Sequence, residues 1–167
     1  MERIPAETWQ DYKGHVRRYQ WAASLTGPGE RVSDIACGVG YAGLLFPFAS
    51  YRGYDKPGVP RADLFPGTFT GCDIDDPAWE PGPCDVTCCF ETLEHAADPA
   101  RLARVIGAST ARAVFVSVPV IPTVHCNEFH RTDFTRDDIP PLFGGFTVAQ
   151  EWPQPEENSH VWMLERA

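Results

Sequence analysis

The feature that most constrains the fold of this chain is a short strand that runs directly into a glycine-rich loop. Residues 31–36 read as the strand, and Gly38, Gly40 and Gly43 follow it with the spacing G-x-G-x-x-G. Glycine lets the backbone approach a ligand closely and permits positive φ. The pattern therefore predicts a ligand-binding turn after the first strand, although a tight turn without a ligand would have the same sequence.

Strand and helix signals alternate along the rest of the chain. The first predicted helix spans residues 6–25 and ends before a Gly-Pro-Gly turn. Further strands are predicted at residues 51–54, 69–72, 85–90, 113–118, 146–151 and 160–165, and further helices at residues 41–48, at 99–109 and from 135 onward. This alternation predicts an α/β fold, in which a parallel sheet carries helices on both faces and ligands sit beyond the carboxyl ends of the strands.

The composition is that of a globular domain. The 167 residues can bury a substantial core, and we predict one domain over residues 1–167, with residues 1–28 as an N-terminal helix or lid and 29–167 as the core. No apolar run approaches the roughly 20 residues that cross a bilayer, and the N-terminus has no secretory signal, so a cytoplasmic location is expected. The cysteines form no C-x-x-C pair and are expected to be buried thiols.

An acid at the end of the second strand indicates a nucleoside ligand. Asp55 lies 15 residues beyond Gly40, and a carboxylate at that place can accept hydrogen bonds from both ribose hydroxyls. NAD and S-adenosylmethionine (SAM) both carry a ribose. SAM is favoured because Asp34, beside the loop, suits an amino-acid tail better than a pyrophosphate. The chain is also short for a dehydrogenase with a separate substrate domain.

Six segments together resemble the class I SAM-dependent methyltransferases, in particular small members with little beyond the core fold. They are residues 15–22 (HVRRYQWA), 32–41 (VSDIACGVGY), 53–55 (GYD), 71–74 (GCDI), 90–99 (FETLEHAADP) and 127–135 (NEFHRTDFT). The resemblance implies a Rossmann-like three-layer α/β/α sandwich whose seven-stranded sheet is mostly parallel with an antiparallel last strand. The chain departs from the pattern at Ser33, where an apolar residue is usual, and over the Pro-rich residues 56–70, where the usual helix is expected to be reduced or missing.

The resemblance also implies residues for the methionine end of SAM. Gly38 and Gly40 would bend around the methionine part, and Asp34 would help to order the loop and the amino group. Glu91 would lie where the chain passes beneath the sulfonium. Arg18 would reach the methionine carboxylate from the N-terminal helix.

At the nucleoside end, the resemblance implies that Asp55 holds the ribose. Asp73 would meet the adenine amino group, or Asp75 in its place, with the Ile74 amide on a ring nitrogen. The complete set of predicted cofactor-binding residues is Arg18, Asp34, Ala36, Gly38, Gly40, Tyr41, Asp55, Lys56, Asp73, Ile74 and Glu91.

Histidines are the candidates for acid–base work on the acceptor. A hydroxyl acceptor benefits from a general base, whereas an amine needs little more than alignment. His130, His125 and His95 follow the fifth and fourth strands on the ligand side of the sheet, and each could instead make structural hydrogen bonds. The spacing of the later two matches no firm ligand signature, so no metal site is predicted. The residues 156–157, both Glu, are expected to form a solvated turn.

These features predict a methyltransferase that moves a methyl group from SAM to an oxygen or nitrogen atom of a small-molecule acceptor. The formal net charge of −9 makes a nucleic-acid acceptor less expected, and a protein acceptor is also less expected. No membrane partner is expected, and a homodimer could supply a lid. Two alternatives stay open: an NAD-linked oxidoreductase, which the three glycines alone would support, and a SAM-fold binding module without catalytic activity.

Overall fold

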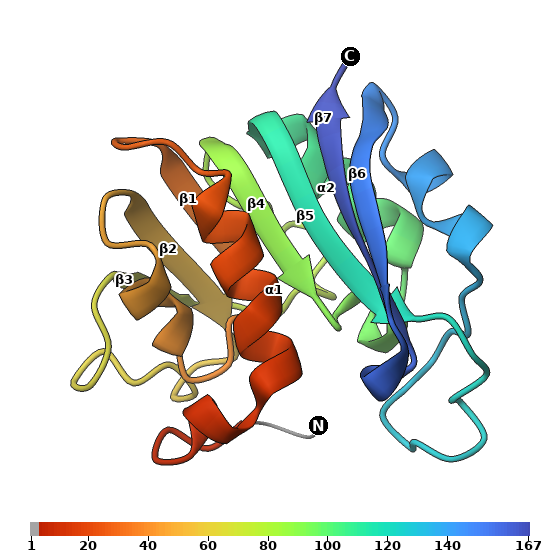
Figure 1. Cartoon of the computed structure of the whole chain (residues 1–167), viewed down its shortest axis with the longest axis horizontal. Helices are drawn as coiled ribbons and strands as arrows, with labels where there is room; N and C mark the ends of the chain where they lie inside the picture. The colour runs from red at the N-terminus through yellow and green to blue at the C-terminus, as the bar shows by residue number, and fades with distance from the viewer. Residues whose placement is uncertain (1–3) are drawn as a thin grey trace.

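The computed structural model describes residues 4–167 and contains one mixed sheet of seven strands. The strands are β1 (Arg31–Ile35), β2 (Ser50–Asp55), β3 (Thr68–Gly71), β4 (Cys84–Phe90), β5 (Thr110–Pro119), β6 (Phe146–Gln154) and β7 (Ser159–Arg166). Their order is β3-β2-β1-β4-β5-β7-β6, and β7 runs antiparallel to both of its neighbours (Figure 1). The predicted fold class, including the antiparallel last strand, is confirmed.

One α-helix covers each face of the sheet (Figure 1). Alternate residues of a strand point to opposite faces, and β5 shows this clearly. Ala113 and Phe115 pack with α1 (Lys13–Ser24), whereas Val114 and Val116 pack with α2 (Pro99–Ser109). The chain therefore has two apolar cores, one on each side of a single sheet.

The two α-helices differ in how clearly the sequence marks their ends. The predicted bounds of α2 are confirmed. The start of this helix is set by Asp98, whose carboxylate accepts a hydrogen bond from the Arg101 amide at 2.8 Å, and by Pro99 in the first turn. The predicted helix over residues 6–25 is too long at its start, since a separate 3₁₀ turn, η1 (Trp9–Asp11), precedes α1.

Short 3₁₀ turns take the place of several expected helices. The predicted helix at 41–48 is the 3₁₀ turn η2 (Tyr41–Leu45), and no helix lies between β2 and β3, as the prolines there led us to expect. The predicted start at Thr135 forms a capping box with Asp138. Prolines at 140 and 141 interrupt that segment, so it yields only η4 (Arg136–Asp138) and η5 (Pro140–Leu142).

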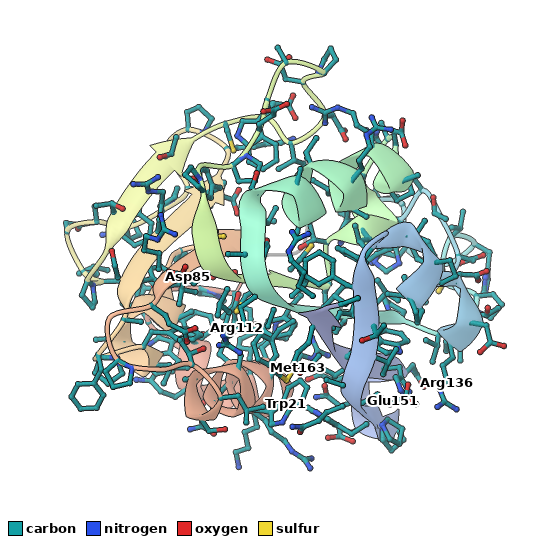
Figure 2. All side chains as sticks on the ribbon, turned by 90° about the horizontal axis from the view of Figure 1, so that it is seen from above. Trp21, Asp85, Arg112, Arg136, Glu151 and Met163 are labelled. Atoms are coloured by element: carbon teal, nitrogen blue, oxygen red, sulfur yellow. The ribbon has the colours of Figure 1, made fainter. Side chains whose placement is uncertain are left out.

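The two edges of the sheet carry different chemistry. The amino ends of the parallel strands, seen in Figure 2, carry ion pairs: Asp85 accepts hydrogen bonds from Arg31 at 2.9 to 3.0 Å, and Arg112 donates to Glu30 at 2.6 Å. The carboxyl ends, at the lower edge in Figure 1, meet the N-terminal segment, the β5–β6 connection and the β6–β7 turn. No helix within residues 4–167 is long and apolar enough to cross a membrane.

Candidate functional site

A cavity of about 470 Å³ opens at the carboxyl ends of the parallel strands. Its walls come from residues 36–39 after β1, Asp55 at the end of β2, Ile74 after β3 and residues between 90 and 95 after β4. The N-terminal segment, residues from 119 to 130 and the β6–β7 turn complete it. The cavity lies where β1 and β4 are neighbours although β2 and β3 separate them in sequence. Parallel α/β sheets bind ligands at this switch point.

Asp55 is fixed against the glycine loop. Its buried carboxylate accepts hydrogen bonds from the backbone amides of Gly38 at 2.8 Å and Lys56 at 2.7 Å. Gly38 has a φ of 58°, and a Cβ added there would meet no atom of the described chain within 4 Å. The loop thus presents bare backbone to open space beside a carboxylate, an arrangement that suits a close-fitting polar ligand.

Asp34 lies beneath this loop. Its carboxylate has no exposed surface and accepts hydrogen bonds from the hydroxyls of Tyr51 at 2.5 Å and Tyr19 at 3.0 Å. Burial raises the pKa of Asp34 to about 7, although both tyrosine hydrogen bonds act in the opposite direction. Asp34 does not line the cavity itself, but it holds the hydroxyl of Tyr19, which does.

The backbone is strained at two adjacent strand ends. Ala36 follows β1 with a φ of 58°, and Glu91 follows β4 with a φ of 48°. Residues other than glycine rarely adopt this left-handed conformation, and such residues cluster at functional sites. Both line the cavity, so the chain is turned sharply on each side of the switch point.

A buried guanidinium connects Glu91 with the β6–β7 turn. Arg18, in α1, has no exposed surface; its Nη1 lies 3.2 Å from Glu91 Oε1, and its Nη2 pairs with Glu157. Glu91 also accepts hydrogen bonds from the hydroxyls of Ser117 at 2.7 Å and Ser159 at 3.0 Å. The Glu91 carboxylate is thereby held in one orientation at the cavity wall.

Two of the three candidate histidines meet at the cavity. The rings of His95 and His130 lie 4.6 Å apart, edge to face, and both line the cavity. His95 Nδ1 is 2.9 Å from the carbonyl oxygen of Phe129, and His130 Nδ1 is 2.6 Å from the hydroxyl of Thr123. His125 is exposed and is not among the described residues that line the cavity.

The cavity is acidic. Four carboxyl groups line it, and no lysine or arginine does so within the part of the chain that the structure describes. The four are Asp55, Glu91, Glu94 and Glu157. Burial and Arg18 lower the pKa of a lining histidine, His15, to about 3, so that this ring stays neutral at physiological pH. A ligand that carries positive charge suits such a site, whereas a pyrophosphate does not.

Comparison with known proteins places the fold. No protein-family model matches the chain, and no curated protein matches it in sequence. Among solved structures, magnesium protoporphyrin IX methyltransferase from Synechocystis PCC 6803, with bound SAH, matches with a TM-score of 0.77 and 16% identity over 100% of this chain and 90% of that one. A putative methyltransferase from Bacillus halodurans C-125 matches with a TM-score of 0.72 and 14% identity, over 92% of this chain and 98% of that one.

The chain has the fold of the class I SAM-dependent methyltransferases. The pyocyanin biosynthetic protein PhzM also shares it, with a TM-score of 0.72 and 18% identity, over 93% of this chain and 56% of that one. The resemblance noted in the sequence motifs is thus confirmed at the level of the fold.

The methyltransferase fold brings some of the predicted cofactor-binding residues together at the cavity and leaves others outside its lining. Those that line the cavity are Ala36, Gly38, Tyr41, Asp55, Ile74 and Glu91. Those that do not, within the described residues, are Arg18, Asp34, Gly40, Lys56 and Asp73. The specific role of every residue in both sets stays a prediction.

Two of the predicted residues outside the cavity lining, Lys56 and Asp73, make hydrogen bonds within their own loops. Lys56 is exposed and contributes its backbone amide to Asp55. Asp73 is exposed and accepts a hydrogen bond from the Asp75 amide at 3.1 Å. Asp75 in turn accepts a hydrogen bond from the Ala97 amide at 2.8 Å, so it joins the loop after β3 to the loop before α2.

Sequence reasoning missed the contribution of the β6–β7 turn. The expectation that both acids of this turn are solvated is wrong for Glu157, which lines the cavity and pairs with Arg18. The available signal is Gly14 in α1, because a Cβ there would lie 1.6 Å from Glu157 Oε1. A glycine within a helical pattern indicates such a close approach, but it does not identify the partner.

Proposed function

We propose that this chain is a SAM-dependent methyltransferase that transfers a methyl group to an oxygen or nitrogen atom of a small-molecule acceptor. The observation that carries the proposal is the acidic cavity at the switch point of a methyltransferase fold. SAM carries a sulfonium and an ammonium group, and the cavity offers carboxylates with no lysine or arginine among its described lining residues. The cavity volume of about 470 Å³ is in the range of small-ligand sites.

The same observation argues against NAD. A pyrophosphate would bring two negative charges beside Asp55, Glu91 and Glu157. Arg18 already pairs with Glu91 and Glu157 and does not line the cavity, so it is not available to the pyrophosphate. In addition, the third glycine of the loop faces protein: a Cβ at Gly43 would lie 2.0 Å from the carbonyl oxygen of Pro66. The third glycine of the G-x-G-x-x-G pattern, Gly43, is therefore explained by packing and does not indicate a dinucleotide.

Bound SAM supplies the methyl group and a sulfonium leaving group, so the protein needs chiefly to align donor and acceptor. We assign Asp55 and the Gly38 loop to the ribose and its surroundings. Glu91, oriented by Ser117 and Ser159, is assigned to the cationic methionine end, and Arg18 acts there by holding Glu91.

The acceptor side of the proposed site is the wall that carries His95 and His130. Both rings line the cavity. They come from the segments that follow β4 and β5, whereas the glycine loop follows β1. We place the acceptor beside these two rings, and we leave His125 out of contact with it, since that side chain is exposed. The names of magnesium protoporphyrin IX methyltransferase and of the mitomycin 7-O-methyltransferase MmcR each specify a small-molecule substrate, which supports an acceptor of that class.

The proposal predicts that Asp55→Ala weakens the binding of S-adenosylhomocysteine at least tenfold, which corresponds to about 1.4 kcal/mol. The physical reason is the loss of a carboxylate that the Gly38 and Lys56 amides hold in place. Isothermal titration calorimetry on the wild type and the variant measures the change.

The matched control is Asp63→Ala. Its exposed carboxylate pairs with the exposed guanidinium of Arg61 at 2.8 Å. This variant should bind S-adenosylhomocysteine as the wild type does. A wild type that binds NADH and not S-adenosylhomocysteine would overturn the proposed function, and equal affinity in Asp55→Ala would remove Asp55 from the ribose role.

A further inference from the structure

Three potential metal ligands meet at the acceptor side of the cavity. Glu94 and His95 belong to η3 (Leu93–His95) after β4, and His130 belongs to the connection after β5. One ligand atom from each residue lies within 4.8 Å of the others, and all three residues line the cavity. The sequence predicts no metal site, because the spacing of His125 and His130 matches no firm ligand signature, and it gives no sign that His130 meets His95.

Glu94 is buried without the partners that a carboxyl group requires. The residue is 1% exposed, and neither carboxylate oxygen has a hydrogen-bond partner among the described residues. His95 Nε2 lies 3.9 Å from Glu94 Oε1, which is beyond hydrogen-bond distance. Buried polar groups are nearly always satisfied, so an unsatisfied carboxyl group that faces a cavity indicates a missing partner.

Both imidazoles are oriented by contacts at their Nδ1 atoms. A carbonyl oxygen only accepts, so His95 Nδ1–H donates to Phe129 and leaves the Nε2 lone pair toward Glu94. His130 Nδ1 contacts the Thr123 hydroxyl, which itself lies 3.5 Å from Asp133 Oδ1 as a donor. Metal-binding histidines characteristically have such partners on the nitrogen that does not bind the ion.

The backbone holds the two ligand-bearing segments together. The carbonyl oxygen of Glu94 accepts hydrogen bonds from the amides of Arg131 at 2.7 Å and Thr132 at 3.3 Å. Asp133 accepts from the amides of Thr123 at 2.6 Å and Val124 at 3.0 Å, which closes the loop that carries His130. The cluster is therefore braced by its own main chain.

We propose that Glu94, His95 and His130 bind a divalent transition-metal ion whose open coordination positions face the cavity. One carboxylate and two imidazoles suit Mn²⁺, Fe²⁺ or Zn²⁺, and three protein ligands leave room for an exogenous oxygen. Ligand atoms about 2.1 Å from such an ion lie roughly 3.4 Å from one another, so binding draws the three side chains inward.

The site defines a class of acceptor, and this part rests on the proposed methyl transfer. The acceptor is an alcohol, phenol or vicinal diol whose oxygen binds the ion. Coordination lowers the pKa of the hydroxyl, which releases its proton to water. The acceptor oxygen then forms a bond to the methyl carbon, the carbon–sulfur bond breaks, and its electron pair remains on sulfur.

The test is the binding of Mn²⁺ to untagged, chelator-treated protein, measured by calorimetry and by the electron paramagnetic resonance signal of free Mn²⁺. Mn²⁺ is the probe because it binds thiols weakly and the chain has six cysteines. We expect one ion per chain. Glu94→Gln and His130→Ala should each weaken binding at least tenfold. His125→Ala, an exposed histidine on the same connection, should bind Mn²⁺ as the wild type does.

A second measurement locates the ion and separates this inference from the proposed function. Bound Mn²⁺ should broaden the proton resonances of S-adenosylhomocysteine in the wild type and not in Glu94→Gln, whose affinity for S-adenosylhomocysteine shows that it is folded. A wild type without stoichiometric Mn²⁺ binding, or equal binding in Glu94→Gln and His130→Ala, overturns the metal site. Mn²⁺ binding that these variants abolish, in a protein that does not bind S-adenosylhomocysteine, overturns the methyltransferase and leaves the metal site.

Discussion

At the residue scale, the site depends on polar side chains that are buried and hydrogen-bond to protein groups instead of water. Asp34 is the clearest case, since its carboxyl group is fully buried below the glycine loop and meets two tyrosine hydroxyls. Its position in the motif was readable from the sequence. Its partners were not, because Tyr19 and Tyr51 come from a helix and a neighbouring strand that only folding brings together.

Asp34 makes stability depend on pH. Burial raises the pKa of this carboxyl from an ordinary 3.8 to about 7 in the folded state. The folded protein therefore binds a proton that the unfolded chain releases near pH 4, and this contribution is lost as pH rises from about 4 to 7. We expect the free energy of unfolding of the wild type, relative to Asp34→Asn, to fall by on the order of 1 kcal/mol per pH unit in that window.

Urea unfolding at pH 4.5, 6.0 and 7.5 measures this difference. The comparison is between variants because His15, whose pKa is lowered to about 3, changes stability with pH in the opposite direction in every variant. Asp63→Asn, at an exposed position, controls for the substitution itself. If the free energies of unfolding of the wild type and Asp34→Asn change with pH in parallel, the pKa of Asp34 is not raised in the folded protein, and the prediction is wrong.

At the element scale, short 3₁₀ turns replace helices where the chain must stay close to the sheet. The turn η2 packs against the β2–β3 connection so tightly that a Cβ at Gly43 would lie 2.0 Å from the carbonyl oxygen of Pro66. The sequence predicts a compact helix at 41–48 that ends near Pro47, whereas the structure has only the 3₁₀ turn. Contact with the Pro-rich connection, which the sequence does not specify, selects the shorter turn.

Gly43→Ala should destabilise the fold by about 2 kcal/mol or more, because the new methyl group collides with backbone that cannot rotate away. For a domain of this size that corresponds to a melting temperature lower by about 4 to 8 °C. Differential scanning calorimetry measures it, with Gly144→Ala as the control, since a Cβ at Gly144 has no neighbour within 4 Å. Equal melting temperatures would mean that η2 can move aside without cost.

At the scale of the whole molecule, Arg18 joins parts of the chain that lie far apart in sequence. From α1 it donates to Gln154 at the end of β6 at 2.6 Å, pairs with Glu157 in the next turn and approaches Glu91 after β4. The guanidinium has no exposed surface. Removal of one partner from a buried charge network leaves the others without compensation, and that cost is large.

Arg18→Met should therefore lower the free energy of unfolding by about 3 to 5 kcal/mol in guanidinium titrations. The adjacent Arg17→Met is the matched control, because Arg17 is 65% exposed and pairs with Glu156 at 3.5 Å; it should cost less than about 1 kcal/mol. The double variant Arg18→Met with Glu157→Gln should recover part of the loss. A loss in Arg18→Met no larger than in Arg17→Met would contradict the proposed role of this network.

The sequence by itself determined the alternation of strands and helices, the glycine loop after β1 and the acid at the end of β2. These follow from residue periodicity, from turn chemistry and from the rule that parallel strands place their carboxyl ends on one edge. Only the tertiary structure decided that Glu157 borders the cavity, that Arg18 is enclosed by acids, and that His130 meets His95 while His125 does not. Those outcomes depend on how connections without regular structure pack against the sheet, and that packing is set by contacts between residues distant in sequence.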